Sequence, residues 1–305
     1  VTLDMGGTSA DVARVDGAPE MRDETTVGPV SIASPCVAVE SVAAGGGSIL
    51  WWDGEAMRVG PRSAGASPGP ACYGTGGPLT LTDANLLLSR IDRTQFAIPV
   101  SLDAAQGQAN ALHAQIAGNS QRKMSMQEML ESFIAIADEA MASAIRAVTV
   151  RRGVDPADHA LVAFGGAGGL HACAVAERLG IRTVVYPLDA GLLCASGISC
   201  APITRIVTSL VLCALSDCDP SMWDRLDQLQ NRGETEMGLL GIDRASTLVT
   251  RKSALMRLAG TEESIEVEIA SHCKRDTLVE SLTAGFRLRF CEIYGFDYDH
   301  TRKIE

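Results

Sequence analysis

Apolar residues recur at helical spacing over residues 125–152, the most regular pattern in the chain. The apolar positions of this segment are Met129, Phe133, Ile136, Ala140, Ala144 and Val148. Ser125 and Glu128 have the spacing of a capping box, and Gly153 follows two arginines, as is typical of a helix end. The pattern therefore predicts a helix over 125–152, and a less regular one predicts another over 101–118.

Short apolar runs separated by glycine turns predict strands elsewhere. Residues 2–16 predict a hairpin whose strands flank the glycine pair of DMGGTSADV. A strand over 159–164, a glycine turn, a helix over 169–179 and a strand over 181–186 form a βαβ pattern. That pattern requires a parallel strand pair within a sheet.

The remaining segments alternate loops with shorter elements. SVAAGGGSILWWDGEAMRVGP predicts two strands joined at WDGE, and PRSAGASPGPACYGTGGP predicts a long loop of the kind that is usually functional. TDANLLLSRI predicts a helix with Thr82 as its N-cap. Further helices are expected near 219–240 and 276–293, and further strands near 247–258 and 263–270.

The composition is that of a globular protein, with 46% apolar and 21% charged residues among 305. The net charge of −11, with no basic cluster, argues against binding to nucleic acid or to an anionic membrane surface. No stretch approaches the roughly 18 apolar residues of a membrane span, and no signal peptide is visible. We therefore expect a soluble, cytoplasmic protein.

Nine cysteines are scattered along the chain without a CxxC pair. An odd number without metal-ligand spacing predicts reduced thiols that pack like small hydrophobic residues, rather than a zinc site or a disulfide framework. Cys72 in GPACYG has no histidine near it in sequence, so we interpret it as a structural thiol and not as a nucleophile.

The turn in DMGGTSADV has the features of an anion-binding turn. Its two glycines let the backbone approach a phosphate closely, and Thr8 and Ser9 add hydroxyl donors. Asp4 and Asp11 would repel phosphate unless they position a divalent cation or its waters. Since the chain has no GxxxxGK[ST] sequence, a purely structural tight turn is an equally consistent interpretation.

FGGAGGLHA forms a second glycine turn, between a predicted strand and a predicted helix. That position favours an anion at the helix N-terminus. The turn lacks the GxGxxG order of a dinucleotide site, and Tyr186 and Pro187 stand where an acidic residue would follow. His171 is a candidate ligand contact, although a packed and hydrogen-bonded histidine is the commoner case.

These motifs together carry a family resemblance. DMGGTSADV resembles the second phosphate-binding hairpin of the actin, hexokinase and Hsp70 ATPase superfamily, and FGGAGGLHA resembles its adenosine-side turn. With SVAAGGGSI, VGPRSAGASPGPACYGTGGP, TLTDANLLLSRI and DAGLLCASGI, they resemble the hydantoinase A and 5-oxoprolinase family from residue 1 to about 210, and more weakly to the end.

The resemblance implies an α/β fold: an actin-like ATPase (ribonuclease H-like) lobe with inserted glycine-rich loops and additional helices. Residues 1–210 would form the ATPase-core domain with helices inserted at about 101–152, and residues 211–305 would continue the same domain. Family members also carry an N-terminal lobe with its own GGT turn. The chain begins with Val1 inside a strand-like segment, so we expect a piece of a longer polypeptide that is inactive alone.

The resemblance also assigns sites for ATP and Mg²⁺. The nucleotide contacts it implies are Asp4, Gly6, Gly7, Thr8, Ser9, Gly165, Gly166, Ala167 and Gly168. Asp4 and Asp11 would bind Mg²⁺ or its waters, and Asp11, Asp83 and Asn85 would be catalytic. The alternative for Asp83 and Asn85 is that they only cap and support their helix.

The implied reaction is ATP-dependent ring opening of a cyclic amide, such as 5-oxoproline or a hydantoin, through phosphorylation of the amide carbonyl oxygen. A hydantoinase B-type subunit or domain would be the partner. The alternatives are a subunit of an ATP-dependent ketone carboxylase of the acetone or acetophenone type, and a non-catalytic nucleotide-binding module.

Two positions depart from the family pattern. Glu40 stands where many relatives have a histidine before the GGGS motif, and Ser67 stands where a histidine often follows SAGA. If those histidines bind a metal in relatives, metal binding is weakened in this chain. The identity of the substrate is open for the same reason.

Overall fold

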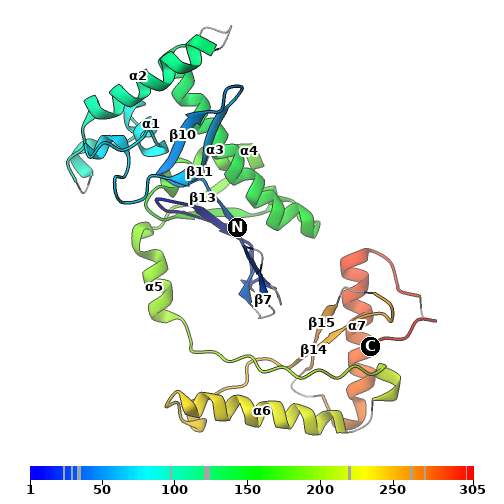
Figure 1. The fold of residues 1–305 in the computed structure, drawn as a ribbon. Coiled ribbons are helices and arrows are strands. Elements are labelled where there is room, and N and C mark those ends of the chain that lie inside the picture. The colour runs from blue at the N-terminus through cyan, green and yellow to red at the C-terminus, as the bar shows by residue number, and fades with distance from the viewer. Residues whose placement is uncertain are drawn as a thin grey trace. The chain divides into compact units, whose positions relative to one another are not determined.

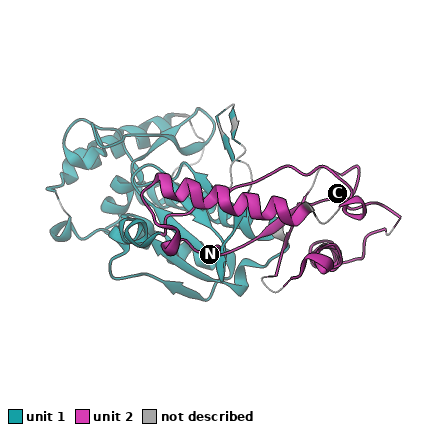
Figure 2. Cartoon of the chain, turned by 90° about the horizontal axis from the view of Figure 1, so that it is seen from below, with its two compact units in different colours: residues 1–201 teal, residues 202–305 magenta. Residues whose placement is uncertain are grey.

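The computed structural model describes residues 1–22, 25–28, 30–32, 36–96, 98–119, 124–218, 221–261, 264–270, 273–299 and 301–305. The chain divides into two compact units, residues 1–201 and residues 202–305 (Figure 2). The expectation of a core domain over 1–210 with a continuation over 211–305 stays a prediction.

The first unit is built on a five-stranded mixed sheet. Its strands are β1 (Thr2–Met5), β2 (Ala10–Ala13), β9 (Val39–Val42), β12 (Ala160–Phe164) and β13 (Thr183–Val185). They lie in the order β13-β12-β1-β2-β9, with β12 parallel to both β1 and β13, and with β2 antiparallel to both β1 and β9. The predicted hairpin and parallel pair are confirmed, and so is the α/β, ribonuclease H-like fold class.

Alternating side chains give the sheet one apolar face and one polar face. Leu3, Met5 and Val12 are fully buried on the apolar face. They share a core with residues of α3 (Met126–Thr149) and α4 (Ala172–Leu179), which contact the strands on this side (Figure 1). Asp4 and Asp11 project from the other face.

The helices expected from the central periodicity are present. They are α2 (Leu102–Asn119) and α3, and Ser125 and Glu128 form the capping box at the start of α3. A short 3₁₀ turn over Val150–Arg152 extends α3, and Gly153 ends it with a φ of 73°. The helix therefore ends where a residue must adopt the left-handed conformation that glycine favours.

The segment before α2 forms a hairpin, a long loop and a helix. The hairpin pairs β10 (Ser48–Trp52) with β11 (Met57–Ser63), as WDGE predicted. The helix α1 (Leu81–Leu87) begins two residues earlier than expected, with Thr80 as its N-cap. The prediction of Thr82 as N-cap is wrong because Thr82 N and Oγ1 both donate to Gly46 O.

Several elements had no strong sequence signal. The apolar helix α5 (Leu193–Cys200) was not predicted, and none of its residues is buried. Short strand pairs lie between β2 and β9: β3 (Val15–Asp16) with β4 (Ala18–Pro19), β5 (Met21–Arg22) with β8 (Cys36–Val37), and β6 (Thr25–Val27) with β7 (Val30–Ile32).

The second unit packs one helix on a two-stranded sheet. Its elements are α6 (Ser221–Leu239), β14 (Ser253–Met256), β15 (Ile265–Glu268) and α7 (Leu278–Tyr294). Phe286, Phe290 and Tyr298 form its aromatic core, with ring centroids 5.6–6.0 Å apart. These elements match the predicted types, although residues 219, 220 and 263 of the predicted ranges lie outside the described residues. Within the described residues, no helix has the length and apolar content that a membrane crossing needs.

Candidate phosphate-binding site

Two glycine turns lie next to each other where parallel strands end. β1 leads into the turn that begins at Gly6, and β12 leads into the turn that begins at Gly165. Ala167 N donates to Met5 O at 2.9 Å, which joins the turns directly. Gly165 has a φ of +81°, and a Cβ there would lie 2.5 Å from Asp4 Oδ1, so only glycine fits. Ligands of α/β sheets bind at this carboxyl edge.

The first turn presents unused backbone donors. Gly6 N donates to Ser9 O at 3.1 Å and closes the turn. Within the described part of the chain, the N–H groups of Gly7, Thr8 and Ser9 have no acceptor. Gly7 and Thr8 are exposed. Successive free N–H groups of this kind form a concave site for a phosphate.

A third glycine turn, Gly45–Gly47, is hydrogen-bonded to the turn that begins at Gly6. Gly46 N donates to Gly6 O at 3.0 Å, and Gly47 N donates to Gly7 O at 2.6 Å. A Cβ at Gly45 would lie 2.5 Å from Thr8 N, so the two backbones touch. The buried glycines of the AAGGGSILW loop therefore pack against the turn that begins at Gly6. The GGG run itself was the signal for such a close approach.

Asp4 and Asp11 form a carboxylate pair beside the first turn. They are direct partners in the β1–β2 register, so their side chains share one face. The Cys194 thiol donates to Asp4 Oδ2 at 2.9 Å, and the Ser41 hydroxyl donates to Asp11 Oδ1. Mg²⁺ typically takes one or two carboxylates and completes its shell with water and phosphate oxygens, so this donor set fits the ion. Among the described residues no cluster of three or more metal-ligating side chains occurs.

The second turn is exposed at its tip and anchored at its ends. Gly166 is exposed, and a Cβ there would meet nothing within 4 Å. Gly168 is buried against Leu3 O. Gly165 N donates to Ala190 O at 3.0 Å, which ties the turn to the segment after β13. The tip of this turn thus has room for a ligand.

Asp83 is fully buried and organises the long loop before α1. Its carboxylate accepts hydrogen bonds from four donors: Ala71 N, Cys72 N, Thr80 N and Thr80 Oγ1. The distances are 2.7–3.1 Å. Burial and the neighbouring Asp83 carboxylate raise the pKa of the Cys72 thiol far above its ordinary value. Cys72 is therefore a packed thiol, as its sequence context suggested. All nine cysteines are free thiols, but the prediction that they pack like small hydrophobic residues is wrong for Cys173, Cys194 and Cys200, which are exposed.

Asn85 is also buried, with 1% of its surface exposed. Its amide nitrogen lies 3.0 Å from Leu81 O and 3.3 Å from His171 Nε2. The geometry of Asp83 and Asn85 favours the supporting role over the catalytic one, because neither side chain reaches the open side of the glycine turns. Their catalytic roles stay predictions.

The two positions that depart from the family pattern lie apart from the carboxylate pair. Glu40 is the register partner of Val12, so it projects from the opposite face of the sheet to Asp11. Ser67 is an exposed residue of the long loop. Neither residue joins Asp4 and Asp11.

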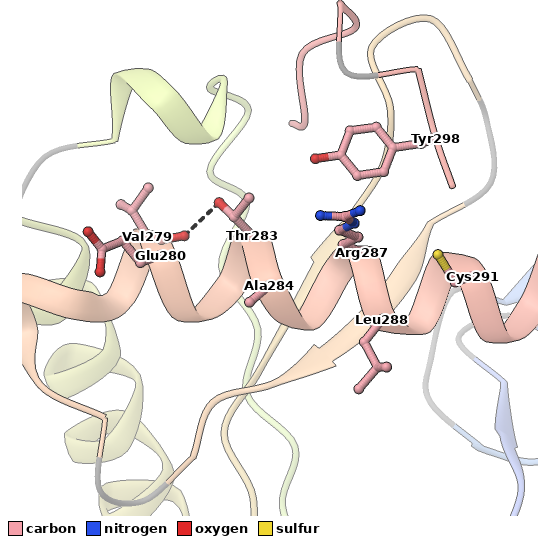
Figure 3. Close-up of a pocket in the computed structure, with 8 residues that line it drawn as sticks. All are labelled: Val279, Glu280, Thr283, Ala284, Arg287, Leu288, Cys291 and Tyr298. Carbon is pink, nitrogen blue, oxygen red and sulfur yellow. Dashed lines mark hydrogen bonds between the residues drawn. The ribbon is translucent and has the colours of Figure 1, made fainter. Parts of the chain in front are cut away.

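A separate hollow of about 720 Å³ lies along α7 in the second unit (Figure 3). Its lining residues are Val279, Glu280, Thr283, Ala284, Arg287, Leu288, Cys291 and Tyr298. Arg287 is paired with Asp297 at 2.5 Å, and Thr283 Oγ1 donates to Val279 O. The lining is mostly one side of a single helix and includes no glycine turn.

The sheet order and the glycine turns at the ends of its strands are those of an actin-like ATPase fold. The chain matches the hydantoinase/oxoprolinase family over residues 1–207, and it belongs to that family.

Curated relatives agree with this assignment. A 5-oxoprolinase of Pestalotiopsis fici is 39% identical over 100% of this chain and 24% of its own length. The 5-oxoprolinase of Saccharomyces cerevisiae is 42% identical over 67% of this chain and 16% of its own length. The alpha subunit of the Pseudomonas jessenii caprolactamase is 32% identical over 97% of this chain and 43% of its own length.

Two solved structures share the fold. The ATP-dependent caprolactamase of Pseudomonas jessenii matches 99% of this chain and 45% of its own with a TM-score of 0.76 and 30% identity. A nucleotide-free acetone carboxylase matches 96% of this chain and 43% of its own with a TM-score of 0.71. At 23% identity, the second likeness concerns the fold alone. The chain thus spans from about a sixth to under half of the proteins it matches.

Proposed function

We propose that the protein containing this chain couples ATP to the ring opening of a cyclic amide. An amide resists hydrolysis because resonance stabilises its C–N bond and because the nitrogen leaves poorly. Phosphorylation of the carbonyl oxygen makes the carbonyl carbon a strong electrophile, so that water can add and the ring can open. The protein's task is then to align the phosphate with that oxygen and to balance its charge.

The observation that carries the proposal is the set of free N–H groups at Gly7, Thr8 and Ser9, beside two carboxylates, in a chain of this family. Backbone donors aimed at an open site stabilise phosphoryl charge without any reorganisation at the moment of reaction. The neighbouring turn that begins at Gly165 supports a nucleotide that extends along the carboxyl edge of the sheet.

Each group has a distinct proposed role. The Gly6–Ser9 turn binds the β- and γ-phosphates, and the Gly165–Gly168 turn lies along the adenosine side. Asp4 and Asp11 hold Mg²⁺ or its waters, and Asp11 is the catalytic carboxylate. The ion, when bound, neutralises charge on the phosphates. The orientation of Asp11 by the Ser41 hydroxyl supports its assignment.

The proposal extends to partners. One relative is named as the alpha subunit of a caprolactamase, which supports a multi-subunit enzyme. We infer that an N-terminal lobe of the same polypeptide completes the nucleotide cleft and that a hydantoinase B-type subunit or domain completes hydrolysis. The cytoplasmic location expected from the sequence remains a prediction.

Cyclic amides are favoured over ketones as the substrate class. Three relatives at 32–42% identity are named for 5-oxoproline or caprolactam. The acetone carboxylase is only 23% identical, so its likeness supports the fold and not the substrate class. A non-catalytic nucleotide-binding module would share the turns, so a turnover experiment must separate it from an enzyme.

The test is substrate-dependent phosphate release by the full-length protein with Mg²⁺ and ATP. The candidates are 5-oxoproline, hydantoin, caprolactam and, with bicarbonate, acetone. We expect one cyclic amide to stimulate phosphate release and to yield its ring-opened acid in equal amount. Stimulation by acetone and bicarbonate would assign a carboxylase instead. Nucleotide binding without stimulation by any of these compounds would assign a binding module.

A further inference from the structure

Three buried polar side chains from three helices meet beside the glycine turns. Asp138 lies on α3, His171 immediately precedes α4, and Asn85 lies on α1, with exposed fractions of 3%, 1% and 1%. His171 Nδ1 is 2.6 Å from Asp138 Oδ1, and His171 Nε2 is 3.3 Å from Asn85 Nδ2. Buried polar groups are costly unless they are hydrogen-bonded, so an apolar trio would fill this space more cheaply. The polar trio therefore calls for a specific role.

The hydrogen-bond partners of His171 indicate the tautomer of its ring. Nδ1 faces a carboxylate oxygen, so Nδ1 carries the proton. Asn85 Nδ2 donates one hydrogen to Leu81 O at 3.0 Å and points the other at His171 Nε2, which accepts it. A second proton on the ring would require Asn85 Oδ1 to take the place of Nδ2, and Leu81 O would then lose its donor. The geometry thus favours the Nδ1-protonated tautomer, and it leaves the buried Asn85 Oδ1 without a hydrogen-bond partner among the described residues.

Asn85 connects His171 to the back of the phosphate-binding turn. One helical turn before Asn85, Thr82 N and Oγ1 hold Gly46 O at 2.8 and 2.9 Å. Gly46 N in turn donates to Gly6 O. A short run of hydrogen bonds therefore leads from the imidazole through α1 to the first glycine of the phosphate-binding turn.

The backbone of His171 leads to the same turn from the other side. His171 N donates to Gly168 O at 3.2 Å, at the end of the second glycine turn. Ala167 N in that turn donates to Met5 O, the residue just before Gly6. The two routes thus end on adjacent residues, Met5 and Gly6. The contact between Asn85 and His171 joins the two routes at their other end.

We propose that His171 is a positioning residue that sets the three glycine turns relative to one another by joining α1 to the start of α4. This inference rests on the proposed function, because the turns it positions are the proposed phosphate and adenosine contacts. Asp138 holds the ring in the tautomer that can accept from Asn85. Asn85, which we had expected to be catalytic, belongs to this support.

Two substitutions of His171 separate positioning from packing. The amide nitrogen of asparagine occupies about the place of Nδ1, so His171→Asn keeps the bond to Asp138 and loses the link to Asn85. The amide of glutamine reaches the place of Nε2, so His171→Gln keeps an acceptor for Asn85 and removes the hydrogen bond from His171 to Asp138, which keeps only its ion pair with Arg178 at 4.0 Å among the described residues. If His171 is a positioning residue, the two variants should differ in opposite ways. His171→Asn should keep its stability and lose activity, while His171→Gln should lose stability and keep its activity below its melting temperature.

Hydrogen exchange in the full-length protein tests the link without any substrate. We expect the amides of residues 43–50 to exchange about tenfold faster in His171→Asn than in the wild type, because the Gly46 and Gly47 bonds open more readily. Asn85→Leu should do the same, since it cuts the link from the other side and keeps the Asp138–His171 bond. His159→Asn is the matched control, because His159 accepts from Arg14 Nε at 3.2 Å and touches none of the turns.

Kinetics with the cyclic amide found active provide the second readout. We expect His171→Asn and Asn85→Leu to lower kcat by about 10²-fold, the usual effect of misplaced phosphate contacts, with melting temperatures close to that of the wild type. Unchanged exchange at residues 43–50 in both variants would overturn the inference, as would losses of activity that simply follow melting temperature. If the wild type turns over no substrate, the proposed function fails, and the exchange data still decide the role of His171.

Discussion

Asp4 and Asp11 lie directly opposite each other on β1 and β2, and both side chains project from the face of the sheet that the helical core leaves uncovered. Like charges placed directly opposite on antiparallel strands destabilise the pair by about 0.2–1 kcal/mol. A fold that needed only a tight turn would have no use for this arrangement. A cation bound between the two carboxylates would turn this repulsion into attraction, and the free N–H groups of the adjacent turn would hold an anion within reach of that cation.

Asp11→Asn in the full-length protein should impair turnover and spare folding. The substitution removes a charge and keeps the size of the side chain, so we expect a loss of about 10²–10³-fold in kcat. The melting temperature should stay unchanged or rise slightly, because the repulsion with Asp4 is relieved. Phosphate release at saturating substrate and thermal unfolding of the same preparation measure both effects. Turnover within threefold of the wild type, with a lowered melting temperature, would remove Asp11 from the catalytic machinery.

Asp83→Asn should show the opposite pattern. The carboxylate accepts from four buried donors, and an amide nitrogen in place of one oxygen would face donors. We expect the free energy of unfolding to fall by about 2–4 kcal/mol, while kcat at low temperature stays close to that of the wild type. Urea unfolding checks the first expectation. Asp92→Asn is a fitting control, since Asp92 accepts only from Thr94 on the surface. Lost turnover in a stable Asp83→Asn protein would restore the catalytic role.

The features that could be predicted from the sequence are those with a local cause. The helix over 126–149 follows from its apolar spacing and its capping box, and the turns at Gly6 and Gly165 follow from glycines placed after apolar runs. The βαβ pattern predicted the parallel pairing of β12 with β13. The neighbourhood of the two turns depends instead on the parallel pairing of β1 with β12, which joins residues far apart in the sequence. The structure of a long periodic segment, or of a turn marked by glycines, is determined largely by residues within that segment.

The features that could not be predicted depend on residues far apart. Thr80 and Thr82 are equally good N-caps by residue type, and the choice is made by Gly46 O, which takes the hydrogens of Thr82. His171 is 86 positions from Asn85 and 33 positions from Asp138 in the sequence, so no local pattern predicts that these three side chains meet. The helix α5 is short and mostly apolar, with Ser196 and Ser199 as its polar residues, so it lacks the apolar stripe at helical spacing that would have indicated a helix.

The β10–β11 hairpin should carry an acid-sensitive contribution from Asp53. Backbone N–H groups of Ala56 and Glu55, and then the Arg58 guanidinium, lower the pKa of Asp53 from 3.8 to about 2. A depressed carboxyl pKa stabilises the fold above the unfolded value, near pH 4, and this contribution is lost as the pH falls through about 2. Urea midpoints of the wild type and Asp53→Asn should therefore differ most near pH 5 and converge near pH 2. A difference that is constant with pH would contradict this assignment.

Cys194 should report on the carboxylate pair. Its thiol donates to Asp4, and this hydrogen bond, with smaller contributions from burial and from the charges of Asp4 and Asp11, raises the pKa of the thiol. Because the thiolate is the reactive form, alkylation at pH 8 should be slow although Cys194 is exposed. Asp4→Asn should accelerate labelling of Cys194 several-fold, and the exposed Cys173 should serve as the unchanged reference, both read by mass spectrometry. Equal labelling rates before and after the substitution would show that the contact is not formed.

Gly45→Ala tests the contact between the first and third glycine turns. The backbone at Gly45 needs no left-handed φ, so space alone decides the outcome. A Cβ there would lie 2.5 Å from Thr8 N and Thr8 C, both backbone atoms of the phosphate-binding turn, and one of the two turns must move. We expect about a 10²-fold loss of kcat, because a displacement of about 1 Å at the phosphates has an effect of that size.

Gly107→Ala is the matched control for that substitution. Gly107 lies within α2, away from both ends of the helix, and it is exposed to solvent. A Cβ there would meet nothing within 4 Å. Alanine should raise the free energy of unfolding by about 0.5–1 kcal/mol, because it lowers the conformational entropy of the unfolded chain, and kcat should not change. The same exchange of glycine for alanine thus has opposite consequences at the two positions. Wild-type turnover by Gly45→Ala would mean that the Gly45–Gly47 turn does not fix the Gly6–Ser9 turn, and the route from His171 to the phosphates would fail with it.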